Sequence, residues 1–393
     1  MSCNFQGYIY QRCELVKKFV EASMKFLREA DIFLLVMCLM SSVYGIILIS
    51  SATRARAGNF IVVQIGAVVI GIVLFILFSY LDIDIIADKS RLLFIFSILF
   101  VLTLIPWGVE IGGRNAWLRF GGIGIQPGEI IKVPLIIILG KMITNYKERK
   151  TLNSFLSLIQ ILFVFGMIFG VVIRVSEDIG TGLVYLGIMV VMLFIGGVKL
   201  RWFLLGSAII AASFPFILNF FTPRHRARIL APFFPDMVES ALLAEVLHQP
   251  NLSRQMISSG GFMGHGLGNG PVTQRGAFFA LESDFIFAAA GEELGFVGLI
   301  GIILLLTIII ARCIYVGTKS NNPLGMLICT GISAMLIVQT LENIGMALGL
   351  LPVIGIPLPF FSYGGSSIVT YFAAAGIVSG IKMRPKPLRF RNL

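Results

Sequence analysis

The chain has 393 residues, of which 57% are hydrophobic and only 13% are charged, and its formal net charge is +11. A mean hydropathy of +0.93, with apolar runs that are long and nearly continuous, excludes a large soluble core, whose apolar runs would be short and periodic. Composition therefore predicts an all-α polytopic membrane protein.

The first 30 residues contain the stretch "CELVKKFVEASMKFLREAD", which is charged and helical in its period. It has neither an apolar core nor a cleavage site of small residues, so it is not a signal peptide. We expect residues 1–30 to form a cytoplasmic amphipathic juxtamembrane segment that lies at the membrane surface.

Ten apolar segments follow, each close to the roughly 20 residues that cross a hydrocarbon layer about 30 Å thick. They form a predicted transmembrane domain over residues 31–381, followed by a basic cytoplasmic tail at 382–393. The predicted spans are 31–51, 60–80, 91–107, 126–144, 152–173, 179–198, 202–221, 284–311, 323–345 and 363–381. An even number of spans places both termini on one side.

Most of the 31 Lys and Arg residues fall on the side of the termini when the spans are threaded in this way. Positive charge is retained on the cytoplasmic side, so both termini are predicted to be cytoplasmic. This bias and the attraction to anionic membrane lipids account for the net charge, and no nucleic acid partner is implied.

The one long connection, 222–283, lies outside the membrane between spans seven and eight. Its stretch "DMVESALLAEVLHQP" can form a short helix, and "SSGGFMGHGLGNGP" permits tight turns or close approach to a ligand. A phosphate cradle and a flexible hinge are both compatible with these glycines, because the lysine and hydroxyl ending of a P-loop is missing.

Three arginines, Arg224, Arg226 and Arg228, stand at the start of this connection, against the inside bias of positive charge. They can meet lipid phosphates or hold a pyrophosphate bidentately, which suits guanidinium geometry.

Ionisable residues also occur within or at the ends of spans. Glu129 and Lys132 share one helical face and can pair, either as a structural ion pair or in support of an active site. Glu177 and Asp178 precede the sixth span, where acidic residues commonly cap a helix.

The segment "LPVIGIPLPFFSYGGSS" follows the ninth span and cannot be a regular helix, because it contains Pro352, Pro357 and Pro359. Irregular backbone at membrane depth survives where it lines a cavity, so we expect an outward-facing cavity here. Its expected hydrogen-bonding residues are Ser362, Tyr363, Ser366 and Ser367.

The stretch "ALESDFIFAAAGEELGFVG" carries four carboxylates, Glu282, Asp284, Glu292 and Glu293, at the mouth of the eighth span and inside it. On one straight helix Glu292 and Glu293 lie about 12 and 13.5 Å deeper than Asp284, so they are predicted to pair structurally with a lysine or with backbone groups of the broken ninth helix. Asp284, in the first turn, is either a helix cap or the carboxylate that reaches a head-group sugar.

The five cysteines and three histidines are scattered without the spacing of a zinc site, and no dedicated ligand cluster for another metal is evident.

Several motifs together resemble those of the bacterial SEDS family, the group of RodA, FtsW and SpoVE proteins, in order over residues 31–381. The motifs are "IQPGEIIKV", "EDIGTGLV", "SGGFMGHGLGNG", "ESDFIFAAAGEELGFVG" and "GLLPVIGIPLPFFSYGGSS". The last motif and the short basic tail are most similar to the RodA branch. Departures from the family pattern are His265 in the glycine-rich tract, "GGRNAW" before the fourth span, and residues 236–250.

The resemblance implies a peptidoglycan glycosyltransferase that polymerises lipid II at the outer face of the bacterial cytoplasmic membrane during elongation and shape maintenance. It implies Asp284 as the catalytic residue, Glu129 and Lys132 as supporting residues, and Asp178 within a conserved helix-start motif. Implied partners are lipid II, a class B penicillin-binding transpeptidase, elongation-complex proteins and membrane lipids. A divalent cation, Mg²⁺ or Mn²⁺, is possible by analogy, and no organic cofactor is implied.

The chemistry predicts one general base, because a sugar hydroxyl displaces a polyprenyl pyrophosphate with inversion and the leaving group needs positive charge rather than an acid. Three alternatives remain open at this point: a lipid II flippase or transporter, which ten helices with buried charges also suit; a non-catalytic scaffold for a transpeptidase; and a division or sporulation relative with the same chemistry.

Overall fold

The computed structural model describes residues 26–54, 56, 58–111, 114–120, 123–219, 222–276 and 278–384. The predicted amphipathic segment, up to residue 25, and the tail from residue 385 lie outside the described residues.

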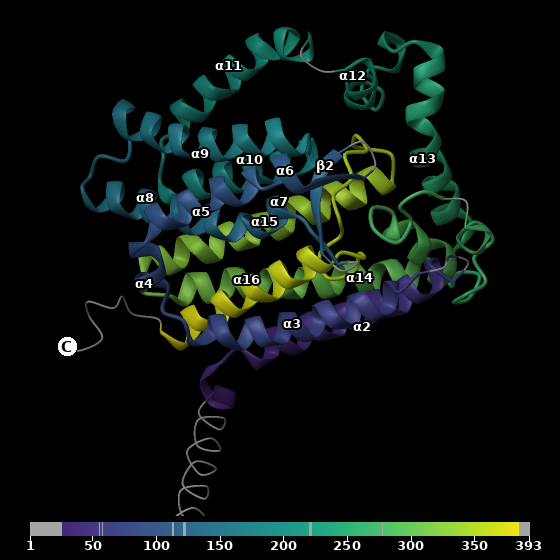
Figure 1. Ribbon diagram of the computed structural model, residues 1–393, viewed down its shortest axis with the longest axis horizontal. Coiled ribbons are helices and arrows are strands. Elements are labelled where there is room, and N and C mark those ends of the chain that lie inside the picture. Colours follow the sequence, from purple (N-terminus) through teal and green to yellow (C-terminus); the bar gives the residue numbers. More distant parts are fainter. Residues whose placement is uncertain are drawn as a thin grey trace, which may run out of the picture.

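Long helices run side by side through the molecule and form one bundle (Figure 1). They are α2 (Ile32–Ala52), α3 (Phe60–Tyr80), α5 (Ser90–Leu102), α8 (Lys132–Glu148), α9 (Phe155–Ser176), α10 (Ile179–Gly196), α14 (Ile286–Lys319), α15 (Pro323–Ala347) and α16 (Gly365–Met383). Helix α11 (Leu200–Asn219) stands apart from them at the top of Figure 1. Short helices α4 (Ile83–Asp88), α6 (Leu104–Trp107) and α7 (Pro127–Ile130) join them.

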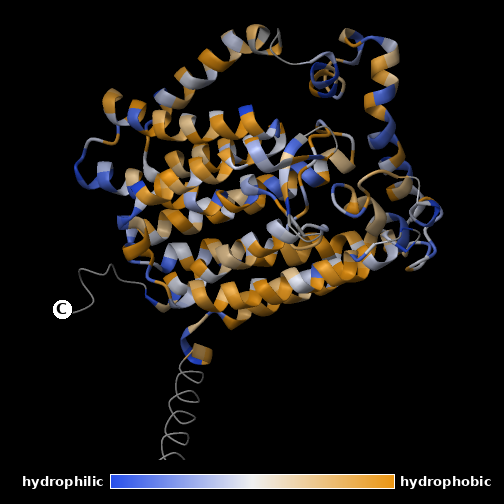
Figure 2. Cartoon of the chain, in the orientation of Figure 1, coloured by the Kyte–Doolittle hydropathy of each residue, from blue (hydrophilic) through white to orange (hydrophobic). Residues whose placement is uncertain are grey.

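Eight helical segments of the described chain are long and apolar enough to cross a membrane, and each coincides with a predicted span. The other two predicted spans correspond to α8, which has 17 residues and begins with a lysine, and to α11, whose apolar stretch is Leu200–Phe214. The bundle is apolar over most of its length (Figure 2), so the predicted polytopic membrane protein is confirmed.

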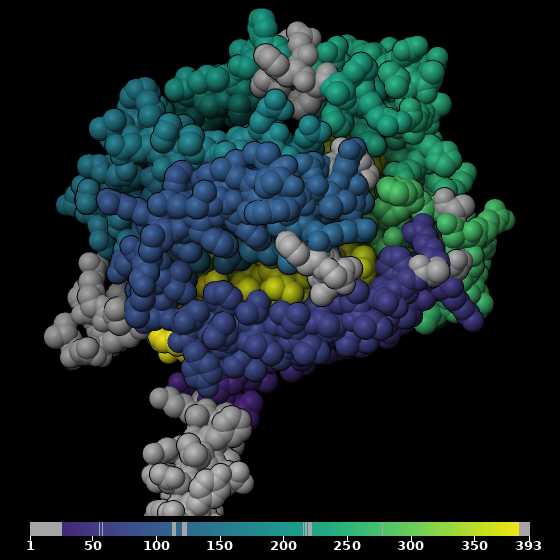
Figure 3. All heavy atoms as spheres, viewed as in Figure 1, coloured from purple at the N-terminus to yellow at the C-terminus, as the bar shows by residue number. Residues whose placement is uncertain are grey.

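Helix α16 is the centre of the bundle, since 83% of its membrane-spanning window is buried, against 17% for Ser90–Trp107. Figure 3 shows its yellow residues at the floor of a groove beside the α2 and α3 layer. Small residues allow this burial: a Cβ on Gly376 would lie 2.5 Å from the backbone oxygen of Phe75 in α3.

The two described ends of the chain meet at one end of the bundle. The backbone N–H of Asp31 donates to Ser379 Oγ at 3.0 Å, and Lys382 Nζ donates to the Ala30 carbonyl at 3.1 Å. The Asp31 carboxylate is buried and accepts a hydrogen bond from Arg312 Nε at 2.8 Å. This contact agrees with the predicted even number of spans, which brings both termini to one side.

A three-stranded antiparallel sheet, which the all-α prediction lacked, lies between α6 and α7. Its strands β1 (Gly108–Ile111), β2 (Arg114–Phe120) and β3 (Ile123–Ile125) follow one another along the chain and pair in that order. The strands are short, with four, seven and three residues, so no alternating apolar run long enough to predict them exists in the sequence.

Helix α14 is broken at Gly295, whose φ of 63° and ψ of −160° are non-helical. The residues from Phe296 onward cover about 36 Å by themselves, which is enough to cross the hydrocarbon layer. They run antiparallel to α2, because Ser51 donates to Glu293 at 2.7 Å while Tyr44 donates to the Gly298 carbonyl at 3.0 Å.

The prediction that Glu292 and Glu293 lie deeper than Asp284 is therefore wrong. Glu293 is level with the last turn of α2, at the outer end of the bundle. The prediction assumed one straight helix. The helix instead breaks at Gly295, whose positive φ is a backbone conformation that other residues rarely adopt.

The outer connection 222–283 contains α12 (Pro223–Leu230), η1 (Pro235–Met237), α13 (Ser240–Ser259) and η2 (Thr273–Arg275). The predicted short helix is the first part of α13. The glycine-rich tract after it wraps around the break in α14: His265 N donates to the Glu292 carbonyl at 3.0 Å, and Phe296 N donates to the Gly261 carbonyl at 2.9 Å. Its glycines thus give close backbone packing.

Candidate functional site

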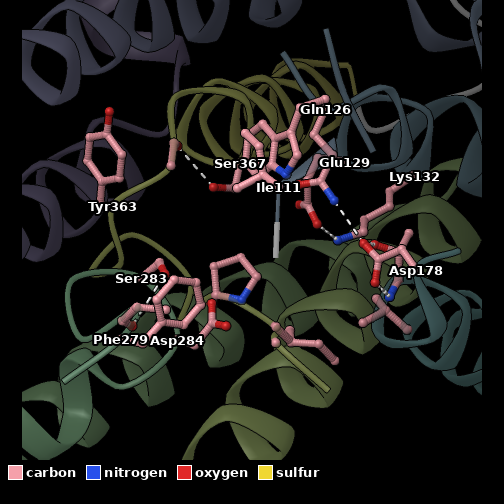
Figure 4. Close-up of a pocket in the computed structure, with 18 residues that line it drawn as sticks. Ile111, Gln126, Glu129, Lys132, Asp178, Phe279, Ser283, Asp284, Tyr363 and Ser367 are labelled. Atoms are coloured by element: carbon pink, nitrogen blue, oxygen red, sulfur yellow. Dashed lines mark hydrogen bonds and ion pairs between the residues drawn. The ribbon is translucent and has the colours of Figure 1, made fainter. Parts of the chain in front are cut away.

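A cavity of about 130 Å³ lies at the outer end of the bundle, beneath the irregular connection between α15 and α16. We call it the first cavity. Figure 4 shows Glu129, Lys132 and Asp178 on one side of it and Phe279, Ser283 and Asp284 on another. Gly355, Ile356, Pro357, Tyr363, Gly364 and Ser367 of the α15–α16 connection and the start of α16 also line it, as the sequence predicted for this broken segment.

Glu129 and Lys132 form a buried ion pair in this wall, with Lys132 Nζ 2.5 Å from Glu129 Oε1. Pro127 starts the short helix α7, and the chain continues directly into α8, so the two side chains are stacked three residues apart. The second carboxylate oxygen of Glu129 has no hydrogen-bond partner among the described residues. The predicted pairing is confirmed, and a polar carboxylate edge remains beside the cavity.

Asp178 caps α10, as predicted, because its side chain accepts a hydrogen bond from Thr181 N at 3.2 Å. It also accepts from Thr181 Oγ1 and from Gln126 Nε2, both at 2.8 Å. Its neighbour Glu177 instead ends α9 in a left-handed conformation with a φ of 53°. Asp178 therefore joins the start of α10 to the residue that precedes α7, and it lines the first cavity.

A second cavity of about 440 Å³ adjoins the first, and both are lined by Phe279, Ala280, Asp284 and Gly355. The other residues lining this second cavity are Arg224, Arg228, Ala244, Glu245, Val246, His248, Gln249 and Val353. Asp284, which is half-buried, is thus placed where a polar cavity and a cationic cavity meet.

Two of the three predicted arginines face this second cavity. Arg224 forms an ion pair with Glu245 of α13, and both side chains are exposed. Arg226 is not a lining residue, and its Nε donates to the Leu218 carbonyl of α11 at 3.2 Å. Arg224 and Arg228 of α12 thus supply positive charge to the cavity that Asp284 also lines.

Asp284 is not the N-cap residue of α14, which begins at Ile286 with Phe285 at the cap and no side-chain capping bond. The alternative of a simple helix cap is therefore wrong. Asp284 follows a tight turn at Ala280, whose φ is 56° and whose carbonyl accepts from Asp284 N at 2.9 Å.

The four predicted hydroxyl residues divide into two groups. Tyr363 and Ser367 line the first cavity, whereas Ser362 and Ser366 lie behind it and hold the backbone. Ser362 Oγ accepts from Leu358 N at 2.8 Å and donates to the Ser283 carbonyl. Ser366 Oγ accepts from Gln126 N, just before α7, at 2.9 Å.

The pKa of the Tyr363 phenol is raised by burial and then by the Glu282 carboxylate, while Arg119 opposes the shift. The phenol is therefore a hydrogen-bond donor at neutral pH.

Glu292 and Glu293 have structural roles, as predicted, but their partners differ from those expected. Glu292 accepts hydrogen bonds from Val272 N and Thr273 N, both at 2.8 Å, and from Thr273 Oγ1 at 2.6 Å. Glu293 accepts from Gln274 Nε2 at 2.9 Å as well as from α2. The two carboxylates fasten the outer connection to the broken helix.

Several lining residues were not predicted as site residues from the sequence: Trp117 in β2, Gln126, and Glu245, His248 and Gln249 in α13. Gln126 belongs to the motif "IQPGEIIKV", which could have pointed to it. The α13 residues come from the part of the outer connection that departs from the family pattern, so the resemblance could not point to them. Trp117 belongs to the sheet that the sequence did not predict.

No three His, Cys, Asp or Glu side chains of the described chain gather closely enough to hold a metal ion. The described side chains of the site thus do not form a dedicated Mg²⁺ or Mn²⁺ centre. Cys38, Cys313 and Cys329 are buried and free.

Comparison with known proteins gives one family. The model of the FtsW, RodA and SpoVE family, described as cell cycle protein, matches residues 29–386. A probable peptidoglycan glycosyltransferase FtsW of Trichlorobacter lovleyi is 30% identical, with 91% of this chain and 96% of the relative covered. Stage V sporulation protein E of Bacillus subtilis is 31% identical (89% and 96%), and peptidoglycan glycosyltransferase MrdB of Escherichia coli is 29% identical (91% and 95%).

Two solved structures share the fold. A chain of a peptidoglycan synthase complex that coordinates polymerization and crosslinking matches with a TM-score of 0.74 and 24% identity, covering 91% of this chain and 98% of that one. The rod shape determining protein RodA of Thermus thermophilus matches with a TM-score of 0.64 and 24% identity (90% and 96%).

Proposed function

Because this chain belongs to the FtsW, RodA and SpoVE family and is a peptidoglycan glycosyltransferase, we propose that it polymerises lipid II into glycan strands at the outer face of the bacterial cytoplasmic membrane, with Asp284 as the general base. The observation that carries the assignment is the position of Asp284, where the polar first cavity meets the second cavity with its arginines.

The reaction needs one proton acceptor near the attacking sugar. The 4-hydroxyl oxygen of one saccharide forms a bond to the anomeric carbon of the other, the bond from that carbon to the pyrophosphate oxygen breaks, and the hydroxyl proton passes to the Asp284 carboxylate. The configuration inverts, because the lipid-linked sugar is α and the strand is β. A positioned carboxylate contributes about 10²- to 10⁴-fold to such a step.

The leaving group is a polyprenyl pyrophosphate, which carries its negative charge away and needs no proton. Arg224 and Arg228 line the same cavity as Asp284, so they can stabilise the charge that develops on the pyrophosphate. Arg224 is paired with Glu245 in this structure and would exchange that carboxylate for a phosphate oxygen. A second catalytic carboxylate, as in glycoside hydrolases, is therefore unnecessary.

The polar groups of both cavities lie at the outer end of the bundle. The lining residues come from the sheet, from α7 and the start of α8, from the starts of α10 and α16, from the segment before α14, and from the α15–α16 and outer connections. A one-sided site of this kind favours chemistry at one membrane face over a flippase, which needs polar groups along the whole path.

Within the family we propose a role in cell elongation and shape, alongside a class B penicillin-binding transpeptidase and other elongation-complex proteins. The support is the motif at 343–367 and the short basic tail, which are most similar to the RodA branch. Relatives named FtsW, stage V sporulation protein E and MrdB match to similar extents, at 30%, 31% and 29% identity. Depletion in cells tests the role: rounding supports it, and filamentation contradicts it.

The activity is tested with the full chain and its transpeptidase partner in vesicles that contain fluorescent lipid II. We expect glycan polymers from the wild type and none from Asp284→Ala in the same time. Movement of lipid II between leaflets without any polymer would favour the transporter instead, and normal polymerisation by Asp284→Ala would refute the assignment of the base.

A further inference from the structure

The backbone that carries Asp284 is held at three successive carbonyl oxygens. The Glu282 carbonyl accepts from Tyr363 N at 2.8 Å, the Ser283 carbonyl accepts from Ser362 Oγ, and the Asp284 carbonyl accepts from Asn343 Nδ2 at 2.8 Å. All three donors belong to α15 or to its connection with α16. Residues 282–284 precede helix α14, so no helical hydrogen bonds within their own segment use these carbonyls.

Asn343 is the donor that binds the backbone carbonyl of Asp284 itself, and its side chain also makes a second hydrogen bond. Its Nδ2 also donates to the Ile356 carbonyl at 2.8 Å, and Ile356 lines the first cavity. Two carbonyl acceptors fix the orientation of the amide, because the nitrogen alone can donate. The side chain is fully buried, and its Oδ1 has no partner among the described residues.

A buried amide with an unpartnered oxygen costs stability, so its retention at this point needs a reason. An apolar side chain of similar volume would pack in the same space without that cost. An apolar side chain would lose the two hydrogen bonds by which Asn343 links Ile356, in the wall of the first cavity, to the Asp284 peptide. The link fixes the position of the Asp284 backbone, from which the carboxylate projects.

We propose that Asn343 is a positioning residue for the reaction: it locks the Asp284 peptide against the α15–α16 connection and so sets the position of the carboxylate relative to the attacking hydroxyl. This inference rests on the proposed role of Asp284 as the base. Misplacement of a reacting group by about 1 Å can cost about 10²-fold in rate. Substrate binding depends on groups elsewhere in the two cavities and should be little affected.

The test compares Asn343→Asp, which keeps the shape but cannot donate when ionised, and Asn343→Ala with the matched control Gln339→Leu. Gln339 lies one turn earlier on α15, is equally buried, has an unpartnered Oε1 and donates to Tyr371 OH at 2.9 Å, away from the segment before α14. Rates of polymerisation are measured over a range of lipid II concentrations, together with the apparent melting temperature of each variant.

We expect both Asn343 variants to lower kcat by about 10- to 100-fold with KM within about threefold of the wild type, while Gln339→Leu keeps kcat within about threefold. In an Asp284→Asn background, Asn343→Ala should lower the residual rate no further, because there is no base left to position.

Three results would overturn the inference. One is a kcat for the Asn343 variants equal to that of Gln339→Leu; another is an additive loss in the Asp284→Asn background. The third is a failure of both Asn343 variants to fold at temperatures where Gln339→Leu is folded, which would assign a purely structural role. If Asp284→Asn itself retains full activity, the proposed base is wrong, and that outcome is distinguished from failure of the positioning role alone.

Discussion

Replacement of Lys132 by methionine should destabilise the protein strongly, and the loss should be reversed by a second substitution at Glu129. The ion pair is enclosed: the side chains of Lys132 and Glu129 are 0% and 3% exposed, and their charged atoms are 2.5 Å apart. In Lys132→Met the carboxylate keeps its burial but loses its counter-ion.

The size of the effect follows from this burial. Removing one partner of a buried pair costs about 3–5 kcal/mol, because an uncompensated charge remains in a medium of low dielectric constant. The adjoining cavity of about 130 Å³ gives water access to the Glu129 carboxylate, which places the expected loss near about 3 kcal/mol. The double variant Glu129→Gln with Lys132→Met carries no buried charge and should recover to within about 1–2 kcal/mol of the wild type.

Unfolding of the purified protein in a mild detergent measures these differences, and polymerisation of lipid II is followed in parallel. A stable double variant with normal activity would assign the pair to structure, and a stable but inactive one would assign it to the reaction. The reasoning is refuted if Lys132→Met is as stable as the wild type, since the buried Glu129 carboxylate would then need no counter-ion.

Three further predictions concern the surrounding residues. Arg224→Gln with Arg228→Gln should raise the KM for lipid II at least tenfold and weaken the salt dependence of the rate, while Arg226→Gln, which faces away from the second cavity, should leave KM within about twofold. Gly295→Ala should lower the apparent melting temperature, because a Cβ there would lie 2.4 Å from a backbone nitrogen and the residue has a positive φ, a strain of at least 1–2 kcal/mol. Glu292→Gln should make the outer connection more sensitive to protease in intact vesicles, because the amide NH₂ would replace an acceptor oxygen and face the backbone N–H of Val272 or of Thr273; unchanged cleavage would contradict the fastening role.

Much of the fold could be predicted because hydropathy in a membrane protein is a strong signal. The eight helices that meet the length and hydropathy of a span were all found from their apolar runs. The broken segment between α15 and α16 was found because Pro352, Pro357 and Pro359 exclude a helix there. The Glu129 and Lys132 pair was found because two charges three residues apart on a helix are neighbours.

Other features depend on contacts that the sequence does not record. The break at Gly295 could not be predicted, because a glycine within an apolar run is equally compatible with a continuous helix; the break is set by the glycine-rich tract that packs against it. For the same reason the predicted depth of Glu292 was wrong. The backbone groups that donate to its carboxylate belong to Val272 and Thr273, which lie 20 and 19 residues earlier in the chain.

The second cavity needed the tertiary structure as well. Arg224 and Arg228 are candidates from the sequence because they stand against the inside bias of positive charge. The sequence does not show that Glu245 and His248 of α13 line the same cavity as these arginines. Sequence reasoning gave equal weight to a lipid contact and a pyrophosphate contact for the arginines. Their place beside Asp284 is what favours the second.

The most direct test of the central proposal is the rate constant of glycan polymerisation for Asp284→Asn, measured in vesicles with saturating lipid II and the transpeptidase partner. Asn keeps the size and the backbone contacts of the residue but cannot accept the proton. We predict a rate about 10²- to 10⁴-fold below the wild type, with less than a tenfold loss for the neighbouring Glu282→Gln, whose carboxylate is bound by Arg56 at 2.7 Å. A rate for Asp284→Asn within threefold of the wild type would contradict the proposal.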